Sequence, residues 1–357
     1  LGDHNLYVAG DVQGSFDNAR ILTSYTYLKN RLNLGVSFVQ YPFFRFRGTR
    51  LQEVPGEDGR LGEFNVFQRD QYRSVGMSAV YPLSRFTRIE GELRGASLQT
   101  DQLLNGVFRP DFEPFRRTID GRTRVFVQPS LGWVHDNSLP GFTGAIGGRR
   151  LRVSIAPALG DLNMADARAD LRHYLPLPGS VTLAQRFLAF GRFDIGPGND
   201  ATEFELAWGG PYFLRGYDPD SYGAAECEAS RAESDFDLFC PAQERAIGSS
   251  ALLLNTELRV PLLNALKDAW LPLNFPALDA ALFFDVGAVW TPGVHELVWR
   301  REPGQDAFLY REPLAAVGAG LRMNLFFAVL RLDYTVPLSR GDEFRRGQWS
   351  LGLGEMF

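Results

Sequence analysis

The chain has 357 residues, 45% of them hydrophobic and 22% charged, a composition typical of a folded protein. No charge-free stretch reaches the roughly 18 apolar residues that a spanning helix needs, which excludes a helical membrane bundle but not spanning strands of about 9 to 11 residues. The formal net charge of −5 and the scattered arginines argue against a nucleic-acid-binding face, so no nucleic-acid partner is expected.

Strands are the predicted elements, because polar and apolar residues alternate with a period of two along most of the chain. In chain order we expect them near 5–14, 19–29, 32–45, 62–81, 86–99, 121–136, 149–159, 163–175, 181–194, 247–261, 278–291, 313–326, 327–338 and 347–357.

The connections between these strands alternate in length. Short turns with proline, such as "YPLSRF", "YLPLPGS" and "RVPLLNAL", alternate with long, polar connections at 46–61, 100–120 and 195–246. Short turns on one side and long loops on the other are typical of outer-membrane barrels. No linker divides the sequence, so we expect a single barrel domain over 1–357.

The alternation separates charged side chains from apolar ones. In "ALLLNTELRVPL", Asn255, Glu257 and Arg259 share one face, while Leu254 and Leu258 lie on the other. A soluble β-sandwich could also pack its apolar face against a second sheet. The length of the strands and the mixture of acids and arginines on the polar faces favour an all-β fold, a transmembrane antiparallel barrel with a charge-lined lumen.

The last strand ends in an aromatic residue. In "GQWSLGLGEMF", the side chains of one face are Trp349, Leu351, Leu353 and Phe357. This ending resembles the C-terminal assembly signal of bacterial outer-membrane barrels. The resemblance implies that the cell's own outer-membrane assembly machinery recognises these residues.

The longest loop contains the motif "GGPYFLRGY", in which Arg215 precedes Gly216 and Tyr217. A lone arginine in a loop is usually a solvated surface residue. Here the following strands offer Glu257 and Asp285 on the lumen face, and a guanidinium removed from water needs such charge-assisted partners. A loop of about fifty residues is usually functional as well.

Five ordered motifs resemble the C-terminal barrel of the bacterial surface-antigen superfamily, which includes BamA-type outer-membrane insertases and two-partner-secretion translocators. They are "GGPYFLRGY", "NTELRVPL", "FFDVGAVW", "VGAGLRMNLF" and "VLRLDYTVPL", followed by "LGLGEMF". The similarity is close over residues 181–357 and extends to the remainder by pattern.

The resemblance implies a sixteen-stranded barrel whose sixth extracellular loop, here 195–246, folds back into the lumen. Arg215, Gly216 and Tyr217 would form its tip and lock the lumen, with Asp285 as the first expected partner of the arginine and Glu257 as the second. The residues expected to extend this charge network are Arg259, Arg322, Arg331 and Asp333.

About fourteen strands are visible in the sequence, two fewer than the resemblance implies. Five follow the long loop, as expected, and nine precede it where eleven are expected. We therefore predict that the chain lacks the first two strands and an N-terminal periplasmic module. The opening "LGDHNLYV" is similar to barrels that follow a TolB-like β-propeller.

Cys227 and Cys240 both lie in the long loop, where an oxidising compartment favours a disulfide between them over two unpaired thiols. Glu90 and Glu92 could be an acid pair, but Arg88 and Arg94 flank them, which favours an ion network over general acid–base catalysis. The histidines lack metal-ligand spacing, and neither a dinucleotide fingerprint nor a nucleophile elbow is present. We predict no enzyme, no cofactor and no metal.

The sequence is compatible with three functions. The first is a barrel of the Gram-negative outer membrane that inserts, assembles or translocates polypeptides, with outer-membrane lipid and unfolded outer-membrane or secreted proteins as its partners. The second is a plugged barrel that anchors an upstream propeller or enzyme. The third, a diffusion porin, is disfavoured because a fixed arginine lock would serve no purpose in it.

Overall fold

The computed structural model describes residues 2–11, 18–56, 59–198, 200–232, 234, 240–262, 277–302, 304–325 and 328–354. Its contacts group the chain into two compact units. The first comprises Leu1–Leu83, Arg88–Leu131 and Ala156–Met164, and the second comprises Ser84–Thr87, Gly132–Ile155 and Ala165–Phe357. Within the described ranges, none of the helices has the length and apolar character required to span a bilayer.

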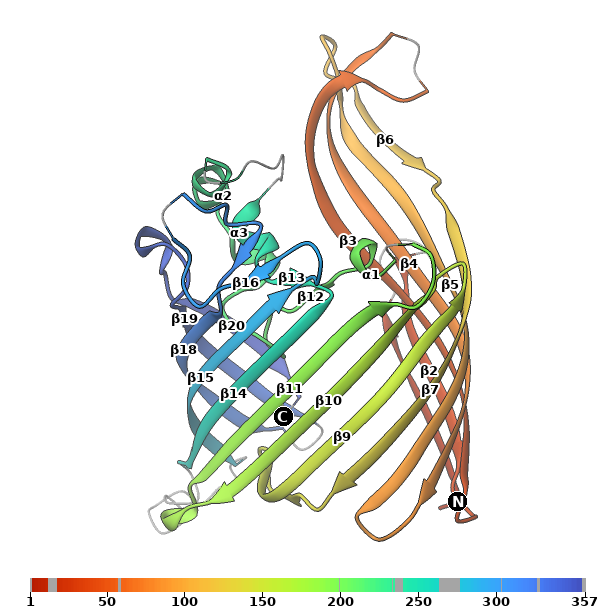
Figure 1. The fold of residues 1–357 in the computed structure, drawn as a ribbon, viewed down its shortest axis with the longest axis vertical. Coiled ribbons are helices and arrows are strands. Elements are labelled where there is room, and N and C mark those ends of the chain that lie inside the picture. Colours follow the sequence, from red (N-terminus) through yellow and green to blue (C-terminus); the bar gives the residue numbers. More distant parts are fainter. Residues whose placement is uncertain are drawn as a thin grey trace. The chain divides into compact units, whose positions relative to one another are not determined.

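The first unit is an antiparallel sheet of long strands, drawn mainly in red to yellow in Figure 1. Neighbouring strands pair in chain order. They are β1 (His4–Asp11), β2 (Arg20–Tyr27), β3 (Asn33–Glu53), β4 (Leu61–Pro82), β5 (Thr87–Phe108) and the short β6 (Pro114–Ile119). β7 (Thr123–Asp136) and β9 (Ala145–Gly160) contribute residues to both units.

The expectation of long loops at 46–61 and 100–120 is wrong for most of these residues, because β3, β4, β5 and β6 continue through them. A register shift between Phe46 and Gly48 interrupts the alternation that the prediction relied on. Beyond it, the strand extensions bury a hydrophobic cluster of their own, which stabilises them. Its buried members are Val54, Phe64, Val66, Leu104 and Phe108, with Phe115 and Ile119 packed against them.

The second unit is an antiparallel sheet with the order β9-β10-β11-β14-β15-β18-β19-β20. Its strands are β10 (Met164–Pro176), β11 (Thr182–Asp194), β14 (Ser250–Pro261), β15 (Leu278–Trp290), β18 (Leu314–Asn324), β19 (Val329–Pro337) and β20 (Gln348–Leu353), with β8 (Leu139–Pro140) paired to β9. Each strand predicted from the sequence therefore has a counterpart in the structure. The parts of the predicted ranges at 12–14, 326–327 and 355–357 lie outside the described residues.

The two long connections of the second unit contain short elements. Between β11 and β14 lie α1 (Asp200–Glu203), β12 (Leu206–Ala207), α2 (Ala224–Arg231), α3 (Pro241–Glu244) and β13 (Ile247–Gly248). Between β15 and β18 lie β16 (Glu296–Leu297) and β17 (Tyr310–Arg311).

Burial in the second unit is the reverse of that in a soluble protein. On β14 and β15 the carboxylates of Glu257 and Asp285 are fully buried, whereas Leu254 and Leu282 of the same strands are 38% and 60% exposed. We call the face that carries Glu257 and Asp285 the inner face. A strand with an apolar outer face and a polar inner face is the pattern of a membrane barrel.

Candidate functional site

The tip segment, residues 208–217, lies within the connection between β11 and β14. A parallel bridge joins Gly209 to Leu214, and the amide of Leu214 donates to the carbonyl of Trp208 at 3.1 Å. A side chain at Gly209 would meet the carbonyl oxygen of Tyr217 at 1.8 Å, so this close chain approach requires glycine. The segment is therefore a compact fold-back rather than an extended loop.

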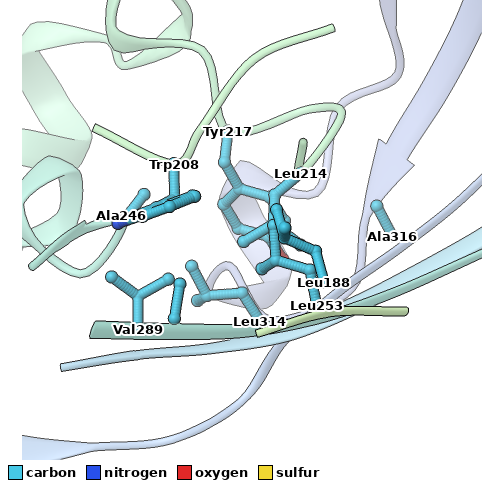
Figure 2. Packing of buried hydrophobic residues seen from close by; sticks show 10 residues of the cluster. Leu188, Trp208, Leu214, Tyr217, Ala246, Leu253, Val289, Leu314 and Ala316 are labelled. Carbon is cyan, nitrogen blue, oxygen red and sulfur yellow. The ribbon is translucent and has the colours of Figure 1, made fainter. Parts of the chain in front are cut away.

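Apolar packing holds the tip segment against the inner face. Figure 2 shows Trp208, Leu214 and Tyr217 above a layer of strand side chains. That layer consists of Leu188 of β11, Ala251 and Leu253 of β14, Val289 of β15, and Leu314 and Ala316 of β18, with Ala246 of the connection. Loss of water contact on all these surfaces stabilises the docked segment.

Arg215 is held by two carboxylates of the inner face. Its Nε donates to Oδ2 of Asp285 at 2.7 Å and its Nη2 to Oδ1 at 2.8 Å, a bidentate pair. Nη1 donates to Oε2 of Glu257 at 3.2 Å. The guanidinium carbon lies 3.4 Å from the ring centre of Phe283, a cation–π contact, and the side chain is only 1% exposed.

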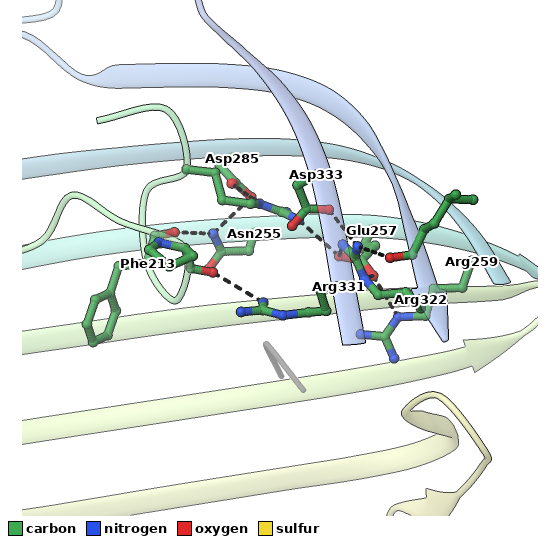
Figure 3. Close-up of polar contacts among 11 residues, drawn as sticks. Phe213, Asn255, Glu257, Arg259, Asp285, Arg322, Arg331 and Asp333 are labelled. Atoms are coloured by element: carbon green, nitrogen blue, oxygen red, sulfur yellow. Dashed lines mark hydrogen bonds and ion pairs between the residues drawn. The ribbon is translucent and has the colours of Figure 1, made fainter. Parts of the chain in front are cut away.

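A wider charge network surrounds this pair (Figure 3). Oε1 of Glu257 accepts from Nε of Arg259 at 2.9 Å and from Nε of Arg322 at 3.2 Å. Arg322 also donates to Asp333 at 2.5 Å. The network thus pairs the three guanidinium groups of Arg215, Arg259 and Arg322 with three carboxylates, which offsets the cost of removing each charge from water.

Two glycines of β18 make room for this network. Opposite Phe283, Gly318 leaves space for the aromatic ring, which would lie 2.3 Å from an added Cβ. Opposite Asp333, Gly320 leaves space for the carboxylate, which would lie 2.1 Å from an added Cβ. The "GAG" of 318–320 therefore accommodates the site's large side chains.

Gly216 and Tyr217 complete the tip. Gly216 has φ of +81°, in the left-handed region that favours glycine, and an added Cβ would lie 3.0 Å from Thr335 and 3.6 Å from Pro337 of β19. The Tyr217 hydroxyl donates to the carbonyl of Ala315 at 2.7 Å and accepts from the amide of Ser339 at 3.1 Å. Burial raises the pKa of Tyr217, so the hydroxyl keeps the proton that it donates.

Arg331, predicted to extend the network, has other partners. Its Nη1 donates to the carbonyl of Pro211 at 3.3 Å, and its guanidinium lies over the ring of Tyr212. Among the described residues, its Nε and Nη2 have no hydrogen-bond partner. The hydroxyl of Tyr212 donates to the carbonyl of Leu353 at 2.9 Å, which joins the tip segment to β20.

The remaining predicted residues do not take part in the charge network. Cys227 of α2 and Cys240, which directly precedes α3, form a disulfide. Trp349, Leu351 and Leu353 of β20 are exposed on the outer face. Phe357 lies outside the described residues. Glu90 and Glu92 of β5 pair with Arg88 and Arg94, respectively, at 2.7 Å.

Sequence reasoning missed two residue sets that hold the tip segment. The Nδ2 of Asn255 donates to the carbonyl of Phe213 at 2.7 Å and to Asp285 at 2.9 Å. Arg186 of β11 forms a bidentate pair with Asp170 of β10 and donates to the carbonyl of Tyr212 at 2.9 Å. Asn255 could have been found, because the alternation puts it on the face of Glu257.

The fold is similar to solved outer-membrane barrels. It matches BamA from Haemophilus ducreyi lacking POTRA domains 1-3 with a TM-score of 0.54 and 15% identity, over 98% of this chain and 70% of that chain. It matches CdiB from Acinetobacter baumannii with a TM-score of 0.54 and 16% identity, over 98% of this chain and 52% of that chain. The chain thus spans about half the length of the CdiB structure.

The sheet, its reversed burial and these likenesses define the chain as a transmembrane β-barrel protein of the outer-membrane class. Residues 118–357 match the model of the Omp85 superfamily domain, which is more than half of the chain. The chain belongs to the Omp85 superfamily. A comparison with curated proteins finds no significant sequence match.

Proposed function

We propose that this chain forms the barrel of a Gram-negative outer-membrane protein that inserts, assembles or translocates polypeptides, and that Arg215, Gly216 and Tyr217 lock its lumen. The observation that carries the proposal is the bidentate pair between the fully buried Arg215 and Asp285, which joins a long loop to the inner face. A simple diffusion pore gains nothing from such a pair. A barrel that must open and close for a polypeptide gains a defined closed state.

The barrel acts without covalent chemistry. It supplies a lumen and strand edges, and an unpaired strand edge is a template for an incoming strand. No catalytic residue and no cofactor take part. The partners are outer-membrane lipid around the apolar outer face, unfolded outer-membrane or secreted polypeptides as clients, and the cell's outer-membrane assembly machinery during the barrel's own insertion.

A second function is favoured by one specific observation. The tip segment is held not only by Arg215 but also by the hydrophobic cluster around Trp208 and Leu214 and by Arg186. Such extensive packing suits a permanent plug. In that case the barrel anchors an upstream propeller or enzyme module to the outer membrane.

The folding of a client barrel distinguishes the two functions. A urea-denatured outer-membrane protein is diluted into liposomes with and without the full-length protein, and the rate at which it folds into the bilayer is followed. Acceleration by the wild type that disappears with Arg215→Ala supports the insertase-type function. Equal client folding rates with the wild type, with Arg215→Ala and without the protein would contradict it and favour the anchor.

A further inference from the structure

The connection between β7 and β9 crosses the inner face of the second unit. We call residues 139–145 the crossing segment. The hydroxyl of Thr143 donates to the carboxylate of Asp279 at the start of β15. The Nδ2 of Asn324, at the end of β18, donates to the carbonyl of Phe142 at 2.5 Å. Nη1 of Arg259, near the end of β14, approaches the carbonyl of Ala145 at 3.4 Å.

The first two residues of the crossing segment form β8, which pairs with β9, so these contacts require the turn between the two strands, residues 141–144, to leave the plane of the sheet. The segment leads directly into β9, yet β18 is five positions away in the strand order β9-β10-β11-β14-β15-β18. With strands about 4.8 Å apart, that is a path of roughly 24 Å along the sheet. A hydrogen bond to Asn324 is therefore possible only because the sheet curves and the segment spans the inner side of the curve.

The crossing segment lies at the strand ends opposite the tip segment's connection. That connection leaves from the end of β11 and returns at the start of β14, whereas Arg259, Asp279 and Asn324 lie near the other ends of their strands. A cavity of about 500 Å³ remains beside the segment, lined by Phe142, Thr143, Val181, Arg259 and Asp279 among others. The segment thus covers this end of the inner side and has free volume next to it.

Arg259 connects the crossing segment to the charge network. Its Nε donates to Glu257 at 2.9 Å, and Glu257 accepts from Arg215 at 3.2 Å. Gly144 packs closely against the same guanidinium, because an added Cβ would lie 2.5 Å from Nη1 of Arg259. A displacement of the segment therefore removes contacts from a group that shares a carboxylate with the lock.

We propose that the crossing segment is a second plug, which covers the inner face of the second unit at the strand ends opposite the long loop and is coupled to the Arg215 lock through Arg259 and Glu257. The inference rests on the proposed function, because a conduit for polypeptides needs an entrance that opens. A client entering from this end must displace the segment from Asp279 and Asn324 before it reaches the lock.

Conductance of the full-length protein in planar lipid bilayers tests this inference without any client. Because two plugs in series both block ion flow, the comparison is made in the Arg215→Ala background. Adding Thr143→Ala and Asn324→Ala removes two hydrogen bonds of the segment, which should raise the open fraction about tenfold or more over Arg215→Ala alone. The matched control is Ser138→Ala, because Ser138 lies in the same connection but bonds Asp136 at the end of β7 and not the opposite strands.

The triple variant carries Arg215→Ala, Thr143→Ala and Asn324→Ala. If its open fraction is no higher than that of Arg215→Ala alone, the inference of a second plug is overturned. Should the triple variant fail to fold, Thr143→Val in the same background decides the question, since it keeps the side-chain volume and loses only the hydroxyl. If the protein does not accelerate client folding but the open fraction of the triple variant rises, the proposed function is contradicted and the inference of a second plug is retained. An unchanged open fraction with normal client folding would contradict the plug alone.

Discussion

Replacing Arg215 by alanine should cost more stability than neutralising its partner with Asp285→Asn. Without Arg215, the fully buried carboxylate of Asp285 keeps one hydrogen bond, from Asn255, and no cation within hydrogen-bond distance among the described residues. Removing one partner of a buried ion pair costs about 3–5 kcal/mol. In Asp285→Asn, Arg215 keeps Glu257 at 3.2 Å and Asp333 at 4.0 Å, so we expect about 1.5–3 kcal/mol.

The double variant Arg215→Ala/Asp285→Asn tests more sharply whether the unpaired carboxylate of Asp285 causes the loss of stability. Once Arg215 is absent, Asp285→Asn removes an uncompensated charge, so the double variant should be more stable than Arg215→Ala alone. The assay is the temperature at which the compact band of unboiled samples is lost on gels. The control is Arg331→Ala, an equally buried arginine that has no carboxylate hydrogen bond among the described residues, which should lower this temperature less than Arg215→Ala. If the double variant lowers this temperature by the sum of the two single-variant decreases, the unpaired charge of Asp285 is not the cause of the instability.

Three further predictions concern other parts of the second unit. Gly320→Ala should lower the same gel-shift temperature, with a loss of about 1–3 kcal/mol of stability, because the added Cβ would overlap the Asp333 carboxylate. The control is Gly95→Ala, which should leave this temperature unchanged because nothing beyond its chain neighbours lies within 4 Å of the added Cβ. Burial and Arg311 lower the pKa of His295 to about 3, so the unfolded chain alone takes up the proton as the pH falls below about 6.5. The free energy of unfolding should be about 2 kcal/mol lower at pH 5 than at pH 7.5, and His295→Gln should abolish this difference. An equal difference in the variant would argue against His295 as its source. Replacing Cys227 and Cys240 by serine removes a cross-link of sequence separation 13, so limited proteolysis should cleave between α2 and α3 faster while the compact gel band persists. Unchanged cleavage would mean that packing alone holds the two helices.

The positions of the strands could be predicted from the sequence because period two is a local signal. The membrane-spanning parts of β14 and β15 alternate without interruption, and both faces were assigned correctly. The extensions of β3 and β5 could not be predicted. A bulge at Phe46–Gly48 resets the alternation, and the cluster around Phe64 that stabilises these extensions forms only when distant strands meet.

The candidate site was predictable only in part, for the same reason. Arg215, Asp285 and Glu257 were identified from a motif and from strand faces, but a strand face alone does not reveal which residues of different strands touch. Arg186, paired with Asp170, holds the tip segment by donating to the backbone carbonyl of Tyr212. Because every residue has a backbone carbonyl, such a contact cannot be recognised from the amino-acid sequence. The crossing segment shows the same limit, because two of its contacts use backbone oxygens of Phe142 and Ala145.

On the proposed function, the charges of the site determine which contact opposes release of the tip segment. Because Glu257 accepts from Arg215, Arg259 and Arg322, it keeps two guanidinium partners when Arg215 leaves. Asp285 has no such reserve, since among the described residues its one partner besides Arg215 is the amide of Asn255. The free energy that opposes release of the tip is therefore concentrated at Asp285 rather than spread over the network. On the proposed function, a client or an incoming strand that offers a cation to Asp285 would lower that barrier most, because no other cation of the described residues lies within hydrogen-bond distance of this carboxylate.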